Sequence, residues 1–338
     1  MSPSPPVPGS DQRRLELIEA GGLGLDIVEL RADRAYPNFR RAPGVVVLGV
    51  HRRGPPPIDG LEAFDILVSA NPDAAAPWVG AKPETLDGLV EQLRTAVERQ
   101  PLAAAVCGQV LRMSLTLSFD QALALESLSY SMLLASKGFR AWREATAVRR
   151  RDDAAEPRVR LERRSGRLEI RLDRAKARNA VDAQMRDALV EALEFARMDP
   201  DQAPVVLSGE GPAFCAGGDL DEFGTADDPG RAHAIRLLRS PVALVHRMRG
   251  RVTANLHGAC IGAGIEIPAA AGRVAARPGA FFRLPEVSMG LIPGAGGTAS
   301  VPRRIGRHRT CYMAISDADL DVRRALSWGL IDAVEPGP

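Results

Sequence analysis

Two glutamates and three glycine-rich loops carry the residue types that could perform chemistry in this 338-residue chain. Glu266 ends a loop that begins at Gly258, and Glu286 follows a proline after a short apolar run. A pair of carboxyl groups can transfer a proton and orient water when their surroundings keep one ionised and the other protonated. Apolar neighbours on both sides of each glutamate indicate partial burial, which argues against two solvated surface charges.

The loops supply a second kind of group, the backbone N–H. They span residues 213–220, 258–266 and 290–298. Glycine lets the backbone approach a ligand closely because it has no Cβ. One such loop is weak evidence, but three in one half of the chain, two with a nearby glutamate, predict a shared site. Residues 294–297 are interpreted as allowing tight packing and starting a helix.

Alternating apolar runs and helical patterns place these loops in an α/β core that begins near residue 168. A buried strand over 203–208 leads to the first loop, and one over 252–257 leads to the second. Further strands are expected at 168–172, 273–276 and 280–282, and helices at 181–198 and 232–248.

The N-terminal part has a different pattern. Short strands are expected at 25–30, 45–50 and 64–69. From residue 85 the apolar period becomes helical, and helices are expected at 85–100, from Pro101 onward and at 119–134. Residues 85–146 are therefore predicted to be mainly helical.

Composition excludes several classes of protein. The net charge is +2, with 45% apolar and 25% charged residues, which is typical of a soluble globular protein and favours neither nucleic acid nor an anionic membrane as partner. The chain has no run of eighteen apolar residues and no secretory signal at its start. The four cysteines lack metal-ligand spacing, so we expect no metal and a reduced, cytoplasmic compartment.

An arginine-rich stretch over residues 147–167 separates the two parts. A phosphate-binding patch is one interpretation. The stretch also contains acids and no aromatic residue, which favours a solvated linker followed by a strand edge.

Residues of about 158–334 resemble the crotonase superfamily, whose founding members are enoyl-CoA hydratases. The resemblance implies an α/β fold, a crotonase-like spiral of β-β-α units, together with an acyl-CoA substrate and a homotrimer or homohexamer. It rests on the stretches 175–180, 213–219, 257–266, 282–286, 290–298 and 325–332.

The resemblance implies a role for four positions. The backbone N–H groups of Gly218 and Ala263 would form an oxyanion hole for a thioester enolate, where donors must already be in place as charge develops. Glu266 and Glu286 match the two glutamates that family hydratases use. The second oxyanion position is often glycine in the family, and alanine keeps the N–H.

The resemblance also implies a coenzyme A site at Arg178, Ala180, Ala216 and Gly217, in which the Arg178 guanidinium would meet a phosphate. Asp219 is interpreted as a helix cap. A lone His257 in front of the second loop is interpreted as structural.

One departure concerns the order of the parts. Family members continue past the strand near residue 334 into terminal helices, and segments similar to those helices lie near 98–103 and 122–142 of this chain. The hypothesis is a relocation of the terminal helices, with an unrelated helical domain as the alternative. The expected division is a disordered leader (1–20), an N-terminal region helical from about 85 (21–146), an Arg-rich linker (147–157) and a crotonase core (158–338).

The expected function is reversible hydration of a 2-enoyl-CoA, with no cofactor beyond the coenzyme A of the substrate. A double-bond isomerase and a cofactor-independent arylacetyl-CoA dioxygenase remain alternatives, because the same enolate serves all three reactions and a fold does not fix a function. A non-catalytic acyl-CoA-binding subunit is a further alternative, against which the presence of both glutamates argues.

Overall fold

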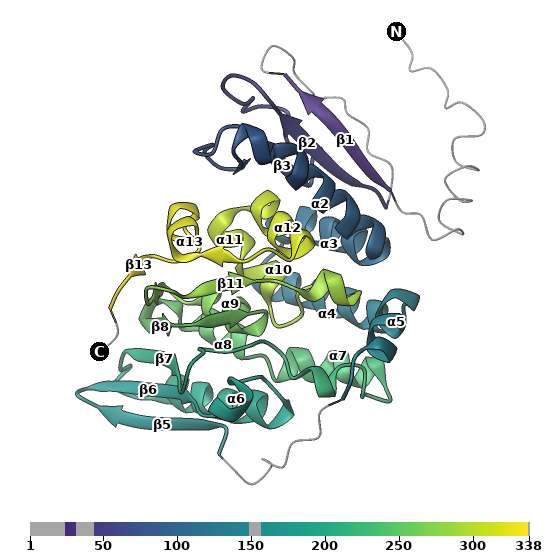
Figure 1. The fold of residues 1–338 in the computed structure, drawn as a ribbon. Helices are drawn as coiled ribbons and strands as arrows, with labels where there is room; N and C mark the ends of the chain where they lie inside the picture. Colours follow the sequence, from purple (N-terminus) through teal and green to yellow (C-terminus); the bar gives the residue numbers. More distant parts are fainter. Residues whose placement is uncertain (1–23, 32–43, 149–156, 337–338) are drawn as a thin grey trace.

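A computed structural model describes residues 24–31, 44–148 and 157–336. An N-terminal region, up to residue 148, packs against a C-terminal region that begins at residue 157 (Figure 1). The predicted leader, 1–20, and most of the predicted linker, 147–157, lie outside the described residues.

The N-terminal region begins with a four-stranded parallel sheet in the order β1-β2-β3-β4. Its strands are β1 (Leu25–Leu30), β2 (Val46–His51), β3 (Ile66–Ser69) and β4 (Val79–Gly80). Both β2 and β3 are buried along their whole length, as expected for short Val/Leu/Ile runs in a parallel sheet covered on both faces. The three strands expected from the sequence are therefore confirmed, and the sheet makes this region α/β.

Four helices follow the sheet, as the helical period from residue 85 predicts. They are α2 (Leu86–Arg99), α3 (Pro101–Ser114), α4 (Phe119–Leu134) and α5 (Lys137–Ala145). Pro101 opens α3 at the position where a missing N–H costs nothing, and Ser118 forms a capping box with Gln121 at the start of α4.

The C-terminal region is built on two sheets. The larger has the order β13-β10-β8-β7-β6-β5 and is parallel except for the β5–β6 pair. Its strands are β5 (Val159–Arg164), β6 (Arg167–Leu172), β7 (Val205–Gly209), β8 (Val252–Leu256), β10 (Arg273–Ala276) and β13 (Ala333–Val334). The smaller has the order β12-β11-β9, with β9 (Ala259–Ile261), β11 (Phe281–Arg283) and β12 (Leu320–Asp321).

The chain passes repeatedly from the larger sheet to the smaller one and then into a helix, which is the predicted spiral. The helices are α6 (Ala183–Met198), α7 (Pro229–Leu238), α8 (Pro241–Arg247), α9 (Ala263–Glu266), α10 (Gly297–Ser300), α11 (Pro302–Ile305), α12 (Arg307–Ser316) and α13 (Val322–Trp328). The single helix expected at 232–248 is wrong. Ser240 caps a new helix whose first residue is Pro241, and proline within a helix would remove a backbone hydrogen bond.

The helices of the N-terminal region lie directly on the C-terminal region. Helix α4 packs against α7 and α10, and helices α2 and α3 pack against α12 (Figure 1). One hydrophobic core contains buried residues of both regions. Side chains of α11 and α12 donate hydrogen bonds to carbonyl oxygens of the N-terminal region, among them Arg303 to Ser114 and Arg309 to Trp78. The two regions therefore share one interior.

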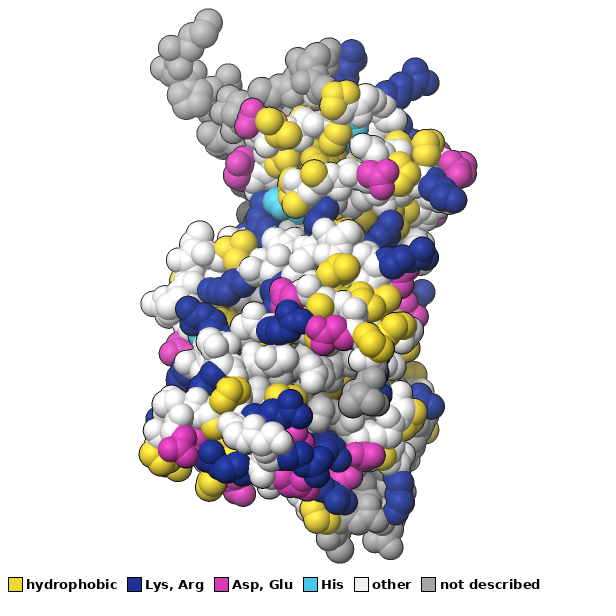
Figure 2. All heavy atoms as spheres, turned by 90° about the vertical axis from the view of Figure 1, so that its left-hand side faces the viewer, with side chains coloured by type: hydrophobic (Ala, Val, Ile, Leu, Met, Phe, Trp, Pro, Cys, Tyr) yellow, Lys and Arg dark blue, Asp and Glu magenta, His cyan; other side chains and the backbone are white. Residues whose placement is uncertain are grey.

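The described arginines of the basic stretch are paired with carboxylates. The pairs are Arg158–Asp182, Arg160–Asp173, Arg163–Asp199, Arg164–Glu162 and Arg167–Glu169. Figure 2 shows basic and acidic side chains mixed over the lower half of one face of the molecule. This pairing favours the solvated strand edge over a phosphate-binding patch, although residues 149–156 lie outside the described part. None of the described helices combines the length and apolar character needed to cross a lipid bilayer.

Candidate active site

The first glycine-rich loop follows β7 and is held in place around Gly218. Val181 N–H donates to the carbonyl of Gly217 at 2.8 Å, and Asp219 N–H donates to the carbonyl of Val181 at 2.8 Å. Gly217 has φ +97°, a conformation that glycine adopts without strain. Within the described residues, the N–H of Gly218 itself donates no hydrogen bond. It is therefore a fixed donor that a ligand could use.

The second loop presents a matching donor at Ala263. This residue is the first of α9, and Gly262 before it has φ +50°. The N–H of a first helical residue has no acceptor inside its own helix, and no other described group accepts it here. Gly218 and Ala263 line the same pocket, which has a volume of about 250 Å³.

Glu266 lies at the end of α9, on the wall of this pocket. Its side chain is 1% exposed. One carboxylate oxygen, Oε2, accepts hydrogen bonds from Ala295 N–H and Gly297 N–H, both at 2.8 Å. A Cβ at residue 297 would lie 2.6 Å from Glu266 Cγ, so the close approach of the third loop requires glycine there.

Glu286 comes to the same pocket from the 3-10 helix η6 (Glu286–Met289) and is 7% exposed. Its Oε2 atom is buried and has no hydrogen-bond partner among the described residues. A Cβ on residue 262 would lie 2.5 Å from Glu286 Oε1, so Gly262 makes room for this carboxyl group. The second glycine-rich loop and the carboxyl group of Glu286 are thus fitted to each other.

The surroundings of the two carboxyl groups differ. Burial raises the pKa of Glu266 to about 7, while the N–H groups of Ala295 and Gly297 and a hydrogen bond with Glu286 act against that rise. Burial, and then the charge of Glu266, raise the pKa of Glu286 well above its usual range. A hydrogen bond between two carboxyl groups needs one proton, and these shifts place it on Glu286. Glu266 is then the ionised member of the pair.

A third carboxyl group comes from the N-terminal region. Glu126 of α4 is 2% exposed and lines the pocket. Its Oε1 accepts from Gly296 N–H at 2.7 Å, and its Oε2 accepts from Thr298 N–H at 2.8 Å and Thr298 Oγ1–H at 2.7 Å. Burial, and next the charge of Glu266, raise the pKa of Glu126 to about 8.

Successive N–H groups of the third loop therefore alternate between two carboxyl groups. Those of residues 295 and 297 bind Glu266, and those of residues 296 and 298 bind Glu126. The three donors to Glu126 lower its pKa without offsetting the rise that burial and the charge of Glu266 cause. The loop holds Glu266 in position, and Glu126 holds the loop.

Aromatic side chains of the N-terminal region complete the wall. The ring of Tyr130 packs on Gly294, where a Cβ would lie 2.4 Å from its Cδ2. The backbone of Phe139, on α5, packs against Gly290, and the ring of Trp142 lies 6.2 Å from that of Phe223, centroid to centroid. The N-terminal helices thus enclose the site instead of standing apart from it.

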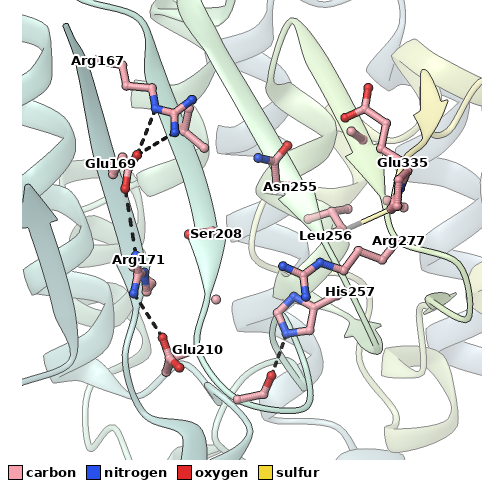
Figure 3. Close-up of a pocket in the computed structure, with 16 residues that line it drawn as sticks. Arg167, Glu169, Arg171, Ser208, Glu210, Asn255, Leu256, His257, Arg277 and Glu335 are labelled. Atoms are coloured by element: carbon pink, nitrogen blue, oxygen red, sulfur yellow. Dashed lines mark hydrogen bonds and ion pairs between the residues drawn. The ribbon is translucent and has the colours of Figure 1, made fainter. Parts of the chain in front are cut away.

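A second, larger hollow of about 610 Å³ lies on one face of the six-stranded sheet. A row of ion pairs runs along one wall (Figure 3): Arg167–Glu169, Glu169–Arg171 and Arg171–Glu210. His257 Nε2 lies 2.9 Å from the carbonyl oxygen of Gly211, which supports the structural interpretation of this histidine. The charges of this row of ion pairs neutralise one another, and neither oxyanion position nor either predicted catalytic glutamate lines the hollow.

A model of the enoyl-CoA hydratase/isomerase family matches residues 162–337, which is more than half of the chain. The chain belongs to this family. The match begins after the N-terminal region, so Glu126 and Tyr130 lie outside it.

Individual family members cover the same part of the chain. An enoyl-CoA isomerase/hydratase of Mycosarcoma maydis is 31% identical over 182 residues, 51% of this chain and 66% of that protein. A mevalonyl-coenzyme A hydratase of Beauveria bassiana is 32% identical over 177 residues, 50% of this chain and 63% of that protein. The chain thus spans less than two thirds of these relatives. An enoyl-CoA hydratase structure from Thermoplasma volcanium aligns at 31% identity with a TM-score of 0.50, over 54% of this chain and 73% of its own.

The residues that the family resemblance assigns to coenzyme A lie beside the pocket. Ala216 N–H donates to the carbonyl of Arg178 at 2.9 Å, which joins the two predicted segments. The carbonyl of Ala180 accepts from Arg174 Nη1 at 3.0 Å. None of Arg178, Ala180, Ala216 and Gly217 lines the pocket next to Glu266, and their assignment stays a prediction.

Other details of this loop agree with the sequence. Asp219 caps the 3-10 helix η3 (Leu220–Glu222), as expected, and also pairs with Arg174 at 2.6 Å. Glu126 was not expected. A signal for it was available, because Glu126 lies on the same helical face as Leu123 and Tyr130, where an ionisable residue is unusual.

Proposed function

We propose that this protein hydrates a 2-enoyl-CoA reversibly, through an oxyanion-stabilised thioester enolate. One observation carries the proposal. Two buried glutamates, Glu266 and Glu286, line a pocket that also contains two backbone N–H groups to which no described residue offers an acceptor. Membership of the enoyl-CoA hydratase/isomerase family supports an acyl-CoA substrate.

The proposed reaction uses each of these groups once. The ionised Glu266 takes a proton from water, whose oxygen forms a bond to C3 of the substrate. The C2–C3 π electrons move to C2–C1, and the thioester oxygen gains negative charge beside the N–H groups of Gly218 and Ala263. Glu286 then gives its proton to C2, and the enolate collapses to the 3-hydroxyacyl-CoA. The chemistry calls for no metal or redox cofactor.

We further propose that helices α3, α4 and α5 do what the terminal helices do in family members, as a relocation of that segment would require. Their contacts with the third loop and with Gly290 support this. The boundary would fall in residues 147–157, ahead of a core at 158–338. We propose a homotrimer or homohexamer on family grounds, which light scattering of the purified protein would test.

Crotonyl-CoA and a panel of longer and aromatic enoyl-CoAs provide the direct test. Loss of conjugated absorbance is expected with at least one of them, and no turnover of any would contradict the proposal. Both Glu266→Gln and Glu286→Gln are expected to lower kcat by roughly 10²–10⁴-fold. Loss in Glu286→Gln alone would indicate a double-bond isomerase, and oxygen uptake with an arylacetyl-CoA would indicate the dioxygenase reaction.

A further inference from the structure

Arg236, on α7, is a charged residue in the pocket that the proposed chemistry does not use. It is half-buried and lines the same pocket as Glu266 and Glu286. Its guanidinium lies over the ring of Tyr130, 5.0 Å from the centroid. The phenol of Tyr130 in turn lies within the fields of Arg236, Glu286 and Glu266. One aromatic ring therefore connects the guanidinium to the two predicted catalytic carboxyl groups.

Two serines of α4 fix one edge of the guanidinium. Its Nε–H donates to Ser127 Oγ at 3.0 Å, and Nη2 donates to the carbonyl of Ser127 at 3.3 Å and to Ser131 Oγ. His233 Nδ1 lies 2.9 Å from the same Ser127 Oγ. The orientation of Arg236 is thus set by neutral acceptors, and Nη1 is the edge without a hydrogen-bond partner among the described residues.

No described carboxylate forms an ion pair with Arg236. The charge of Glu126 acts on Arg236, but both carboxylate oxygens of Glu126 accept hydrogen bonds from Gly296 and Thr298. Burial lowers the pKa of Arg236, as expected for a cation removed from water without a carboxylate at contact distance. Such a charge is costly unless something else in the pocket compensates it.

We propose that Arg236 binds a carboxylate at the far end of the acyl group, so that the preferred substrates are thioesters of dicarboxylic acids. This inference rests on the proposed function and names its substrate class. A carboxylate would accept hydrogen bonds from Nη1, and charge-assisted bonds of this kind are the strong ones. A plain alkyl chain reaching the same place would cover the Nη1 donors and deprive them of water. The apolar walls, among them Leu123, Val242 and Ile267, guide the chain, and the charge selects its end.

Binding of saturated thioesters tests this without turnover. Glutaryl-, adipyl- and pimelyl-CoA are compared by calorimetry with pentanoyl-, hexanoyl- and heptanoyl-CoA, together with free coenzyme A. For at least one chain length the wild-type protein is expected to bind the dicarboxylic thioester about tenfold or more tightly than its partner. Equal binding across all pairs would overturn the proposal, and it would leave hydration of crotonyl-CoA unaffected.

Two variants test whether Arg236 causes the preference for dicarboxylic thioesters. Arg236→Gln is expected to remove the difference between partners, whereas Arg231→Gln, on the same helix and exposed, is expected to keep it. If Arg236→Gln instead weakens all six thioesters and free coenzyme A equally, Arg236 binds a phosphate of coenzyme A and the proposal is wrong. The wild-type ratio decides the matter even if the variant does not fold.

Discussion

The C-terminal region contributes backbone donors and two glutamates from short loops, whereas the N-terminal region contributes side chains from long helices. Gly258 to Glu266 contains one oxyanion position and one predicted catalytic carboxyl group within nine residues. Glu126 and Tyr130 reach the same pocket from helix α4, which lies more than a hundred residues earlier. The groups proposed for the chemistry thus lie close together in the sequence, whereas the contacts that hold them in place come from residues far away in the sequence.

Beyond the two glutamates, the largest effect is expected at a backbone group of the C-terminal region. Ala263→Pro removes the N–H while keeping a residue suited to the first position of α9. The expected loss in kcat/KM is roughly 10²–10³-fold, as for other oxyanion donors. Ala263→Gly is the matched control, because it keeps the N–H and should retain most of the activity.

Position 263 is a cleaner test than position 218. A Cβ on Gly218 would lie 2.6 Å from the ring of Phe223, so substitution there also disturbs packing. A folded Ala263→Pro protein with wild-type turnover would show that this N–H does not bind the thioester oxygen.

A smaller effect is expected from the N-terminal region. Glu126→Ala leaves three buried donors of residues 296 and 298 without an acceptor and loosens the loop that holds Glu266. We expect kcat to fall about 10–100-fold with little change in KM, since misplacement of a catalytic group costs rate. Asp120→Asn, exposed on the same helix, is the control.

Glu126→Gln separates positioning from simple support. Glutamine keeps the shape of the side chain but cannot ionise, so any change in rate caused by ionisation of Glu126 above its pKa of about 8 should disappear from the pH–rate profile. An unchanged profile, together with unchanged kcat in Glu126→Ala, would restrict Glu126 to a role in stability.

The smallest effect is expected in the pH dependence of the free energy of unfolding, to which Glu126 of the N-terminal region and Glu266 of the C-terminal region both contribute. The pKa values of Glu126 and Glu266 are raised to about 8 and about 7, so the folded protein binds more protons than the unfolded chain above pH 4.5. The stability linked to these protons is complete below that pH and is lost as pH rises toward 8, by on the order of 1–3 kcal/mol per group.

Urea unfolding at pH 5.5 and pH 8.5 measures this loss. The free energy of unfolding should fall between the two pH values, and both Glu126→Gln and Glu266→Gln should reduce the fall. A double variant that reduces it by less than the sum of the single variants would show that the two carboxyl groups interact across the regions. Parallel curves for all four proteins would contradict the interaction.

The C-terminal loops can be recognised in the sequence for a physical reason. Gly262 must leave room for Glu286, and Gly297 must leave room for Glu266, so these two positions require glycine. Such constraints leave a visible pattern. The strand β7, which precedes the first loop, begins with an apolar run that is equally visible.

The contribution of the N-terminal region was visible only in part. Helix α4 was predicted from its period, but nothing local tells which loop its buried face meets. Glu126 and Thr298 are 172 positions apart, and a contact at that separation depends on how the whole chain packs. The break between α7 and α8 was not predicted, because the apolar period continues across it. Ser240-Pro241 is nevertheless a typical start of a new helix.

The hydrogen bonds from Glu126 to the third loop also have a consequence in time. At ordinary rates of translation, helix α4 leaves the ribosome on the order of ten to thirty seconds before Thr298 is made. During that interval the third loop, against which the helix packs in the folded protein, has not yet been synthesised. Contacts of such long range form late in folding. The candidate site is therefore complete only late in folding, when the third loop closes on helix α4.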